Sequence, residues 1–71
     1  MNKYEFILIV KGLTEADNKR KLHISLNNRR FYNGVVSDTS DEMTFSFFDN
    51  KIGQITLLYN TIINIEPWKK R

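Results

Sequence analysis

Short runs in which apolar and polar residues alternate restrict the fold of this 71-residue chain more than any other feature of its sequence. Residues 22–26 and 43–47 both alternate in this way. A period of two residues is typical of a β-strand with one buried face, whereas a helix repeats every three to four residues. Three further runs rich in β-branched and aromatic residues, at 30–37, 54–59 and 62–65, also predict strands.

The segments between these runs carry residues that favour turns. Asn27 and Asn28 separate the first two runs, residues 38–41 and 49–53 form the next two loops, and Asn60–Thr61 is a tight turn. Pro67 ends the last strand because it has no N–H to donate. Five short strands joined by short turns predict a mainly β fold, a small, strongly bent antiparallel barrel of five strands, rather than alternating strands and helices.

The first part of the chain is less regular. Residues 4–10 have high β-propensity but no clean alternation, so they fit either a fully buried strand or a short helix, which Gly12 ends in both cases. Thr14, followed by Glu15 and Asp17, has the pattern of a helix N-cap with acids in the first turn. We expect a strand followed by one helical turn, with a short N-terminal helix as the alternative to the extra strand.

The length and the absence of cysteine indicate a chain that needs another source of stability. Domains of this size bury only roughly 60% of the surface of their unfolded chain. Disulfides and thiolate metal sites are excluded because the chain has no cysteine, so oligomerisation remains. We expect a single domain over residues 1–71, with an N-terminal segment at 1–20, the barrel at 21–67 and a basic tail at 68–71.

Composition also limits the function classes. The net charge of +3 permits nucleic-acid binding without establishing it. The apolar run 6–10 is far shorter than the roughly 20 residues that a membrane-spanning helix needs, and no secretory signal is evident, so we expect a soluble, cytoplasmic protein without a membrane partner.

Residues for catalysis are also scarce. His23 is the only histidine, it alternates with apolar neighbours and so faces outward, and no phosphate-binding glycine loop is present. The acids Asp38, Asp41 and Glu42 fit a solvated turn better than a cation site, because their loop has no glycine-rich ligand pattern. We expect no enzymatic activity, no cofactor, no metal and no small-molecule substrate.

One segment resembles a known motif. Leu26, Arg30, Tyr32, Gly34 and Val36 fall without a gap on the first motif of Sm and Sm-like (LSm) proteins. The glycine allows a strand to bend sharply where a side chain would obstruct the fold. Residues 62–67, an apolar strand closed by Ile-Glu-Pro, are similar to the end of the second motif of that family. The resemblance covers roughly residues 20–67 and implies a barrel that assembles into a ring and binds RNA.

The residues that bind uridine in that family are mostly replaced here. Ser40 and Thr44 stand where eukaryotic and archaeal Sm proteins have aspartate and asparagine, while Met43 keeps the stacking position between them. Leu58 and Tyr59 stand where the family has arginine and glycine, and the asparagine that follows is retained as Asn60. RNA contacts are therefore expected to use a different set of groups.

These considerations give two sets of candidate residues. The candidates for RNA binding are Arg29, Arg30, Met43, Thr44, Tyr59 and Asn60. In the family the fourth strand of one subunit pairs with the fifth strand of the next, which implies subunit contacts at Ile55, Leu57, Ile63 and Ile65. The expected partners are RNA and further copies of the chain in a homo-oligomeric ring.

Alternatives remain open for individual residues and for the whole chain. Met43, Phe45 and Phe47 are expected in the core. Phe48 points the other way, into a second layer or a subunit contact. Tyr59 either stacks on a nucleobase or anchors its turn or a subunit contact. The alternative function is that of an SH3-like barrel for protein interaction, without a ring and without nucleic-acid binding.

Overall fold

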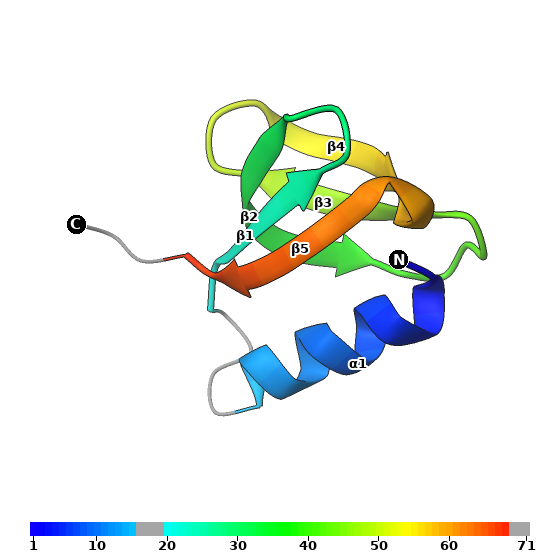
Figure 1. Ribbon diagram of the computed structural model, residues 1–71. Helices are drawn as coiled ribbons and strands as arrows, with labels where there is room; N and C mark the ends of the chain where they lie inside the picture. The colour runs from blue at the N-terminus through cyan, green and yellow to red at the C-terminus, as the bar shows by residue number, and fades with distance from the viewer. Residues whose placement is uncertain (16–19, 69–71) are drawn as a thin grey trace.

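The computed structural model describes residues 1–15 and 20–68 and has one helix followed by a β-sheet (Figure 1). Its elements are the helix α1 (Lys3–Thr14), the strands β1 (Leu22–Leu26), β2 (Phe31–Asp38), β3 (Thr44–Asp49) and β4 (Gly53–Leu58), the 3₁₀ turn η1 (Tyr59–Thr61) and the strand β5 (Ile62–Pro67). The prediction of a mainly β fold with five antiparallel strands is confirmed, with strand ends that differ from the expected ones by at most two residues.

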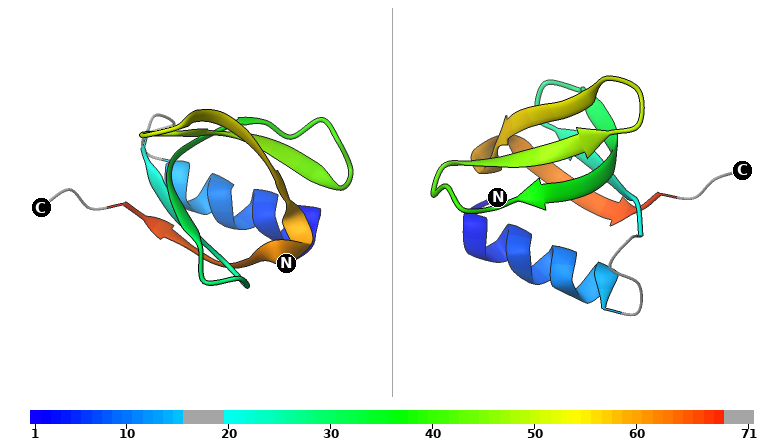
Figure 2. Two further views of the ribbon diagram at one scale, coloured as in Figure 1. Left: turned by 90° about the horizontal axis from the view of Figure 1, so that it is seen from above. Right: turned by 180° about the vertical axis from the view of Figure 1, so that it is seen from behind.

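The five strands form one sheet in the order β4-β3-β2-β1-β5. The sheet curves strongly, so that its two ends approach each other through η1 (Figure 2). Register shifts between Ser25 and Leu26 and between Val36 and Asp38 accompany this curvature, since bulges increase bending and twist. Among the described residues no ladder joins β4 to β5, and these two strands are therefore the edges of the sheet.

Gly34 lies within β2, opposite Leu22 of β1 on one side and Asp49 of β3 on the other. A Cβ atom at this position would lie 1.8 Å from the carbonyl oxygen of Phe48, which is backbone and cannot move aside cheaply. The physical reason inferred from the sequence, that a side chain would obstruct the bend, therefore holds at this position.

The core lies between the concave face of the sheet and α1. Its fully buried members include Phe6 from the helix and Phe45 from β3, whose ring centroids are 4.3 Å apart. The other buried apolar residues are Leu22, Ile24, Leu26, Phe47, Leu57, Tyr59, Ile62 and Ile65. The helix contacts β5 and η1 and covers one side of this cluster, as Figures 1 and 2 show.

The favoured strand at residues 4–10 is wrong, and the alternative of a short N-terminal helix is confirmed, because this segment belongs to α1. The Asn2 side chain caps the helix by accepting a hydrogen bond from the backbone N–H of Glu5 (2.8 Å), and Gly12 lies inside the helix. Burial of Phe6, with Val10 and Leu13 packed against the core from the same side, outweighs the β-propensity of the segment.

The expected helix start at Thr14 is also wrong, since this residue ends α1 and donates its hydroxyl hydrogen bond to the carbonyl of Val10 (2.7 Å). Glu15 is the C-cap of α1, and Asp17, the other acid of that predicted turn, lies outside the described residues. Across the described ranges, no helix combines the length and the apolar character needed to cross a membrane.

The prediction that Met43 belongs to the core is wrong, whereas Phe45 and Phe47 are buried as expected. Met43 precedes the first residue of β3 and is 64% exposed, so the alternation of the strand does not reach it. Phe48 faces the other side and is 53% exposed. His23 is half-buried, and its Nδ1 lies 2.6 Å from the amide oxygen of Asn33.

Candidate nucleic-acid interface

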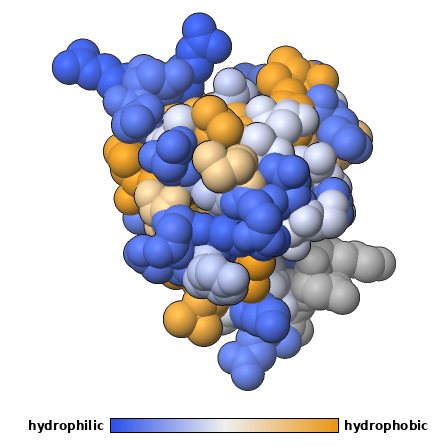
Figure 3. All heavy atoms as spheres, turned by 90° about the vertical axis from the view of Figure 1, so that its right-hand side faces the viewer, coloured by the Kyte–Doolittle hydropathy of each residue, from blue (hydrophilic) through white to orange (hydrophobic). Residues whose placement is uncertain are grey.

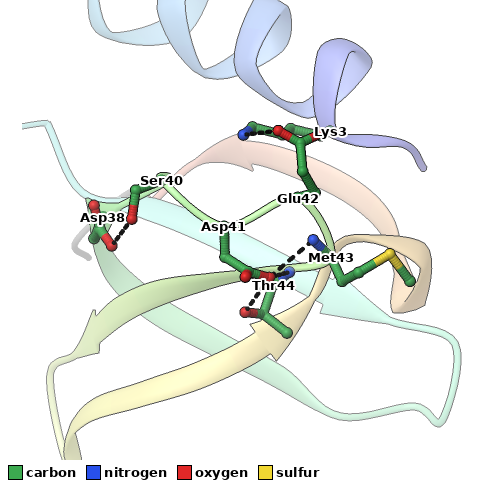
Figure 4. Close-up of polar contacts among 7 residues, drawn as sticks. All are labelled: Lys3, Asp38, Ser40, Asp41, Glu42, Met43 and Thr44. Atoms are coloured by element: carbon green, nitrogen blue, oxygen red, sulfur yellow. Dashed lines mark hydrogen bonds and ion pairs between the residues drawn. The ribbon is translucent and has the colours of Figure 1, made fainter.

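The loop between β2 and β3 is organised around the carboxylate of Asp41 (Figure 4). One oxygen of this carboxylate accepts hydrogen bonds from the backbone N–H groups of Met43 (2.9 Å) and Thr44 (3.0 Å) and from the Thr44 hydroxyl (3.1 Å). The N–H groups of Met43 and Thr44, followed by that hydroxyl, lower the pKa of Asp41 below its ordinary value. The loop is therefore held in shape by an ionised acid.

A long-range ion pair connects this loop to the helix. The ammonium group of Lys3 lies 3.2 Å from the carboxylate of Glu42, and the Lys3 side chain is largely buried while that of Glu42 is exposed (Figure 4). A pocket of about 160 Å³ lies beside the pair, lined by Met1, Asn2, Lys3, Glu42, Met43, Tyr59 and Asn60. Sequence reasoning missed Lys3 because only the fold brings it close to a loop 39 residues away.

Tyr59 is buried and does not present its ring to solvent. The residue is 3% exposed, and its ring packs against those of Phe6 and Phe45, with centroid distances of 5.2 and 5.0 Å. Burial raises the pKa of Tyr59, and its hydroxyl has no hydrogen-bond partner among the described residues. A ring this buried offers no open face on which a base could stack, so the position agrees with the alternative in which Tyr59 anchors its turn.

The structure separates the candidate RNA-binding residues into two groups. Met43 and Asn60 are exposed and meet at the pocket beside the Lys3–Glu42 pair, and Thr44 is half-buried next to them. Arg29 and Arg30 lie in the β1–β2 turn, which a hydrogen bond from the backbone N–H of Asn27 to the carbonyl of Thr61 (2.8 Å) joins to η1. They do not line the pocket at which Met43 and Asn60 meet.

The turn that carries the two arginines lies where Asn27 and Asn28 predicted one. Its left-handed residue is Arg29 (φ 69°) and neither of these asparagines. The amide oxygen of Asn28 instead accepts a hydrogen bond from the backbone N–H of Arg30 (3.0 Å). Both arginine side chains are exposed as a result.

The end of the sheet that carries the β2–β3 loop, called the loop end below, is acidic. The loop end carries Asp38, Asp41 and Glu42, and the described residues lining its pocket include one lysine, which is already paired with Glu42. Figure 3 faces this end and shows hydrophilic side chains separating small apolar patches. A phosphate backbone approaching these acids would be repelled, so the loop end is a poor electrostatic match for RNA.

The candidate subunit contacts lie on the two edge strands but differ in exposure. Leu57 of β4 and Ile65 of β5 point into the core of their own chain, and Ile55 packs partly against it. Ile63 is 63% exposed on β5. Leu58, which the sequence did not single out for this role, is 44% exposed at the end of β4.

No family model, no curated protein and no solved structure matches the chain. The described residues also contain no group of three or more histidine, aspartate or glutamate side chains placed to hold a metal ion.

Proposed function

We propose that this protein is a non-catalytic, Sm-like RNA-binding protein that assembles into a homo-oligomeric ring. The observation that carries the proposal is the pair of unpaired edge strands, β4 and β5, at the two ends of a strongly curved antiparallel sheet. The helix before β1 and the requirement for glycine at position 34 are in keeping with the Sm-like resemblance of residues 20–67.

The edge strands supply the reason for assembly. An edge presents unpaired backbone N–H and C=O groups, which invite pairing with another chain. If β4 of one copy pairs with β5 of the next, each copy uses two different surfaces. Repetition of this contact closes a ring when the rotation between neighbouring copies adds up to a full turn. The exposed side chains of Leu58 and Ile63 would be covered in that arrangement. The barrel is then completed between neighbouring copies.

Light scattering on a size-exclusion column tests the assembly. We expect the wild-type chain to elute as a complex of several copies at micromolar concentration. Ile63→Glu places a charge at an exposed position of β5, so it should leave the fold intact and shift the population towards monomers. Leu8→Glu is the matched control, because Leu8 is 73% exposed on the outer face of α1. A wild-type monomer at micromolar concentration would contradict the ring.

RNA binding is tested with short oligo(U) and oligo(A) at two salt concentrations. We expect affinity to fall as salt increases, because lysine and arginine contacts to phosphates release counterions. A folded protein that binds neither oligonucleotide at low salt contradicts the RNA part of the proposal. In that case the chain would be an SH3-like module for protein interaction, the alternative with which the acidic loop agrees.

A further inference from the structure

We infer that an aromatic groove at the end of the sheet opposite to the acidic loop stacks the bases of single-stranded RNA. This inference rests on the proposed function for the identity of its ligand, and it places the contact at residues that were not expected to bind RNA. The groove is lined by Phe31, Tyr32, Asn33, Asp49, Asn50, Lys51, Ile52 and Trp68.

The groove is formed by three segments distant in sequence. The start of β2 forms one wall, the turn between β3 and β4 forms another, and Trp68, directly after β5, forms the third. Its volume is about 470 Å³, within the range of sites that bind small organic molecules. Figures 1 and 2 place the β3–β4 turn and the end of β5 away from η1 and from the loop that precedes β3.

The apolar side chains of the groove are open to solvent. Phe31 is 59% exposed and Ile52 is 61% exposed, although both are large apolar residues. Tyr32 and Trp68 are half-buried, so they add aromatic surface that is already positioned. Exposed aromatic rings are the groups on which unpaired bases stack, with little dependence on sequence.

Backbone hydrogen bonds hold the walls of the groove in place. The carboxylate of Asp49 accepts from the backbone N–H groups of Asn33 (3.1 Å), Lys51 (2.8 Å) and Ile52 (3.1 Å). The backbone N–H of Asn50 donates to the carbonyl of Asn33 (2.8 Å). The groove is therefore formed before a ligand arrives, which reduces the entropic cost of binding.

The third wall is fixed in the same way. The backbone N–H of Trp68 donates to the carbonyl of Lys21 (3.0 Å), and the ammonium group of Lys21 lies 5.6 Å from the centre of the indole ring. A lysine thus stands next to the aromatic surface of Trp68.

Charge identifies the occupant as a polyanion. Lys51 lines the groove, and Arg30 directly precedes Phe31. Asp49 is the one acid among the lining residues, and its charge is already engaged by three N–H groups. Aromatic faces with cations around them suit a flexible chain of bases and phosphates, which is single-stranded RNA under the proposed function.

The single tryptophan of the chain provides a direct readout. Titration of the wild-type protein with oligo(U) and oligo(A) should quench the fluorescence of Trp68 as bases enter the groove. Phe31→Ala should weaken binding by about fivefold or more, as expected for the loss of one base–aromatic stack. Phe48→Ala is the matched control, because Phe48 is similarly exposed (53%) on β3 but does not line the groove, and its affinity should stay within twofold of wild type.

A second variant tests the electrostatic part. Lys51→Gln should reduce the slope of log K against log salt by about 0.7, the value for one phosphate contact on a single strand. Circular dichroism and the melting temperature of each variant should match those of the wild-type protein, because the substituted side chains are exposed.

The possible failures can be told apart. If RNA binds while Phe31→Ala and Lys51→Gln behave like wild type, the groove assignment is overturned and the proposed function survives. If Met43→Ala alone weakens binding, the site lies at the acidic loop and the groove assignment is again overturned. If the folded protein binds no RNA at low salt, or binds only an acidic aromatic peptide, both the groove assignment and the RNA-binding function are overturned.

Discussion

Asp49 connects two parts of the chain that local sequence does not relate. It ends β3, it is almost completely buried, and its three backbone hydrogen bonds tie the β3–β4 turn to the start of β2. Burial raises the pKa of this carboxyl, but the N–H groups of Lys51, Ile52 and Asn33 lower it by more, so the net pKa lies below the ordinary value. The folded state therefore favours the ionised form.

This pKa shift predicts a loss of stability in acid. An aspartate whose pKa is lower in the folded state contributes stability above its unfolded pKa of about 3.9, and that contribution is lost as pH falls through the folded pKa. Urea denaturation should show a lower free energy of unfolding at pH 3 than at pH 7. Asp49→Asn should be destabilised at pH 7 by about 1–3 kcal/mol, and its further loss at pH 3 should be smaller.

Asp41→Asn is the comparison for this experiment. The N–H groups of Met43 and Thr44 lower the pKa of Asp41 as well, but its carboxylate is exposed and screened by water. Asp41→Asn should change the difference between the free energies of unfolding at pH 7 and pH 3 less than Asp49→Asn does. Equal effects of the two substitutions would contradict a special role for the buried carboxylate.

At the scale of the elements, α1 is held by tertiary packing more than by its own sequence. It contains several β-branched residues and Gly12, all of which are weak helix formers. Phe6 fastens it to the core through Phe45 and Tyr59, and the N-terminal ammonium group donates to the carbonyl of Ile62 (3.2 Å). The helix is therefore an integral cover of the core.

Gly12 offers a test of the helix. A Cβ atom at this exposed position would meet nothing within 4 Å, so only helix propensity distinguishes alanine from glycine there. Gly12→Ala should raise the free energy of unfolding by about 1 kcal/mol. The melting temperature, followed by circular dichroism, should increase by about 4–8 °C for a domain of this size.

Gly53→Ala is the matched control, because a Cβ there also meets nothing within 4 Å but the residue has φ +83°. The left-handed conformation disfavours alanine, so this variant should be destabilised by about 1 kcal/mol. If both variants shift in the same direction, the account of either the helix or the turn is wrong.

At the scale of the whole molecule, the curved sheet leaves β4 and β5 as edges on a domain with a small core. Under the proposed assembly, unfolding is coupled to dissociation, and stability then depends on concentration by mass action. Each tenfold increase in protein concentration should add about 1 kcal/mol per copy, which corresponds to several degrees in melting temperature. Ile63→Glu should remove this dependence, and a constant wild-type melting temperature over a hundredfold range would contradict the assembly.

The sequence by itself determined the strands and the bend. Alternation at residues 22–26, turn residues between the runs and a glycine at position 34 are local signals, because strand period and backbone freedom depend on neighbouring residues. They were sufficient to predict five antiparallel strands and the position in β2 that has no room for a side chain.

Only the tertiary structure decided what covers the core and which side chains remain exposed. It made a helix of residues 3–14, buried the ring of Tyr59 and exposed Met43, since burial depends on partners distant in sequence. It also joined Lys3 to Glu42 and brought Phe31, Ile52 and Trp68 around one groove. Such groupings follow from the order and curvature of the strands, and no single segment of the sequence specifies that order.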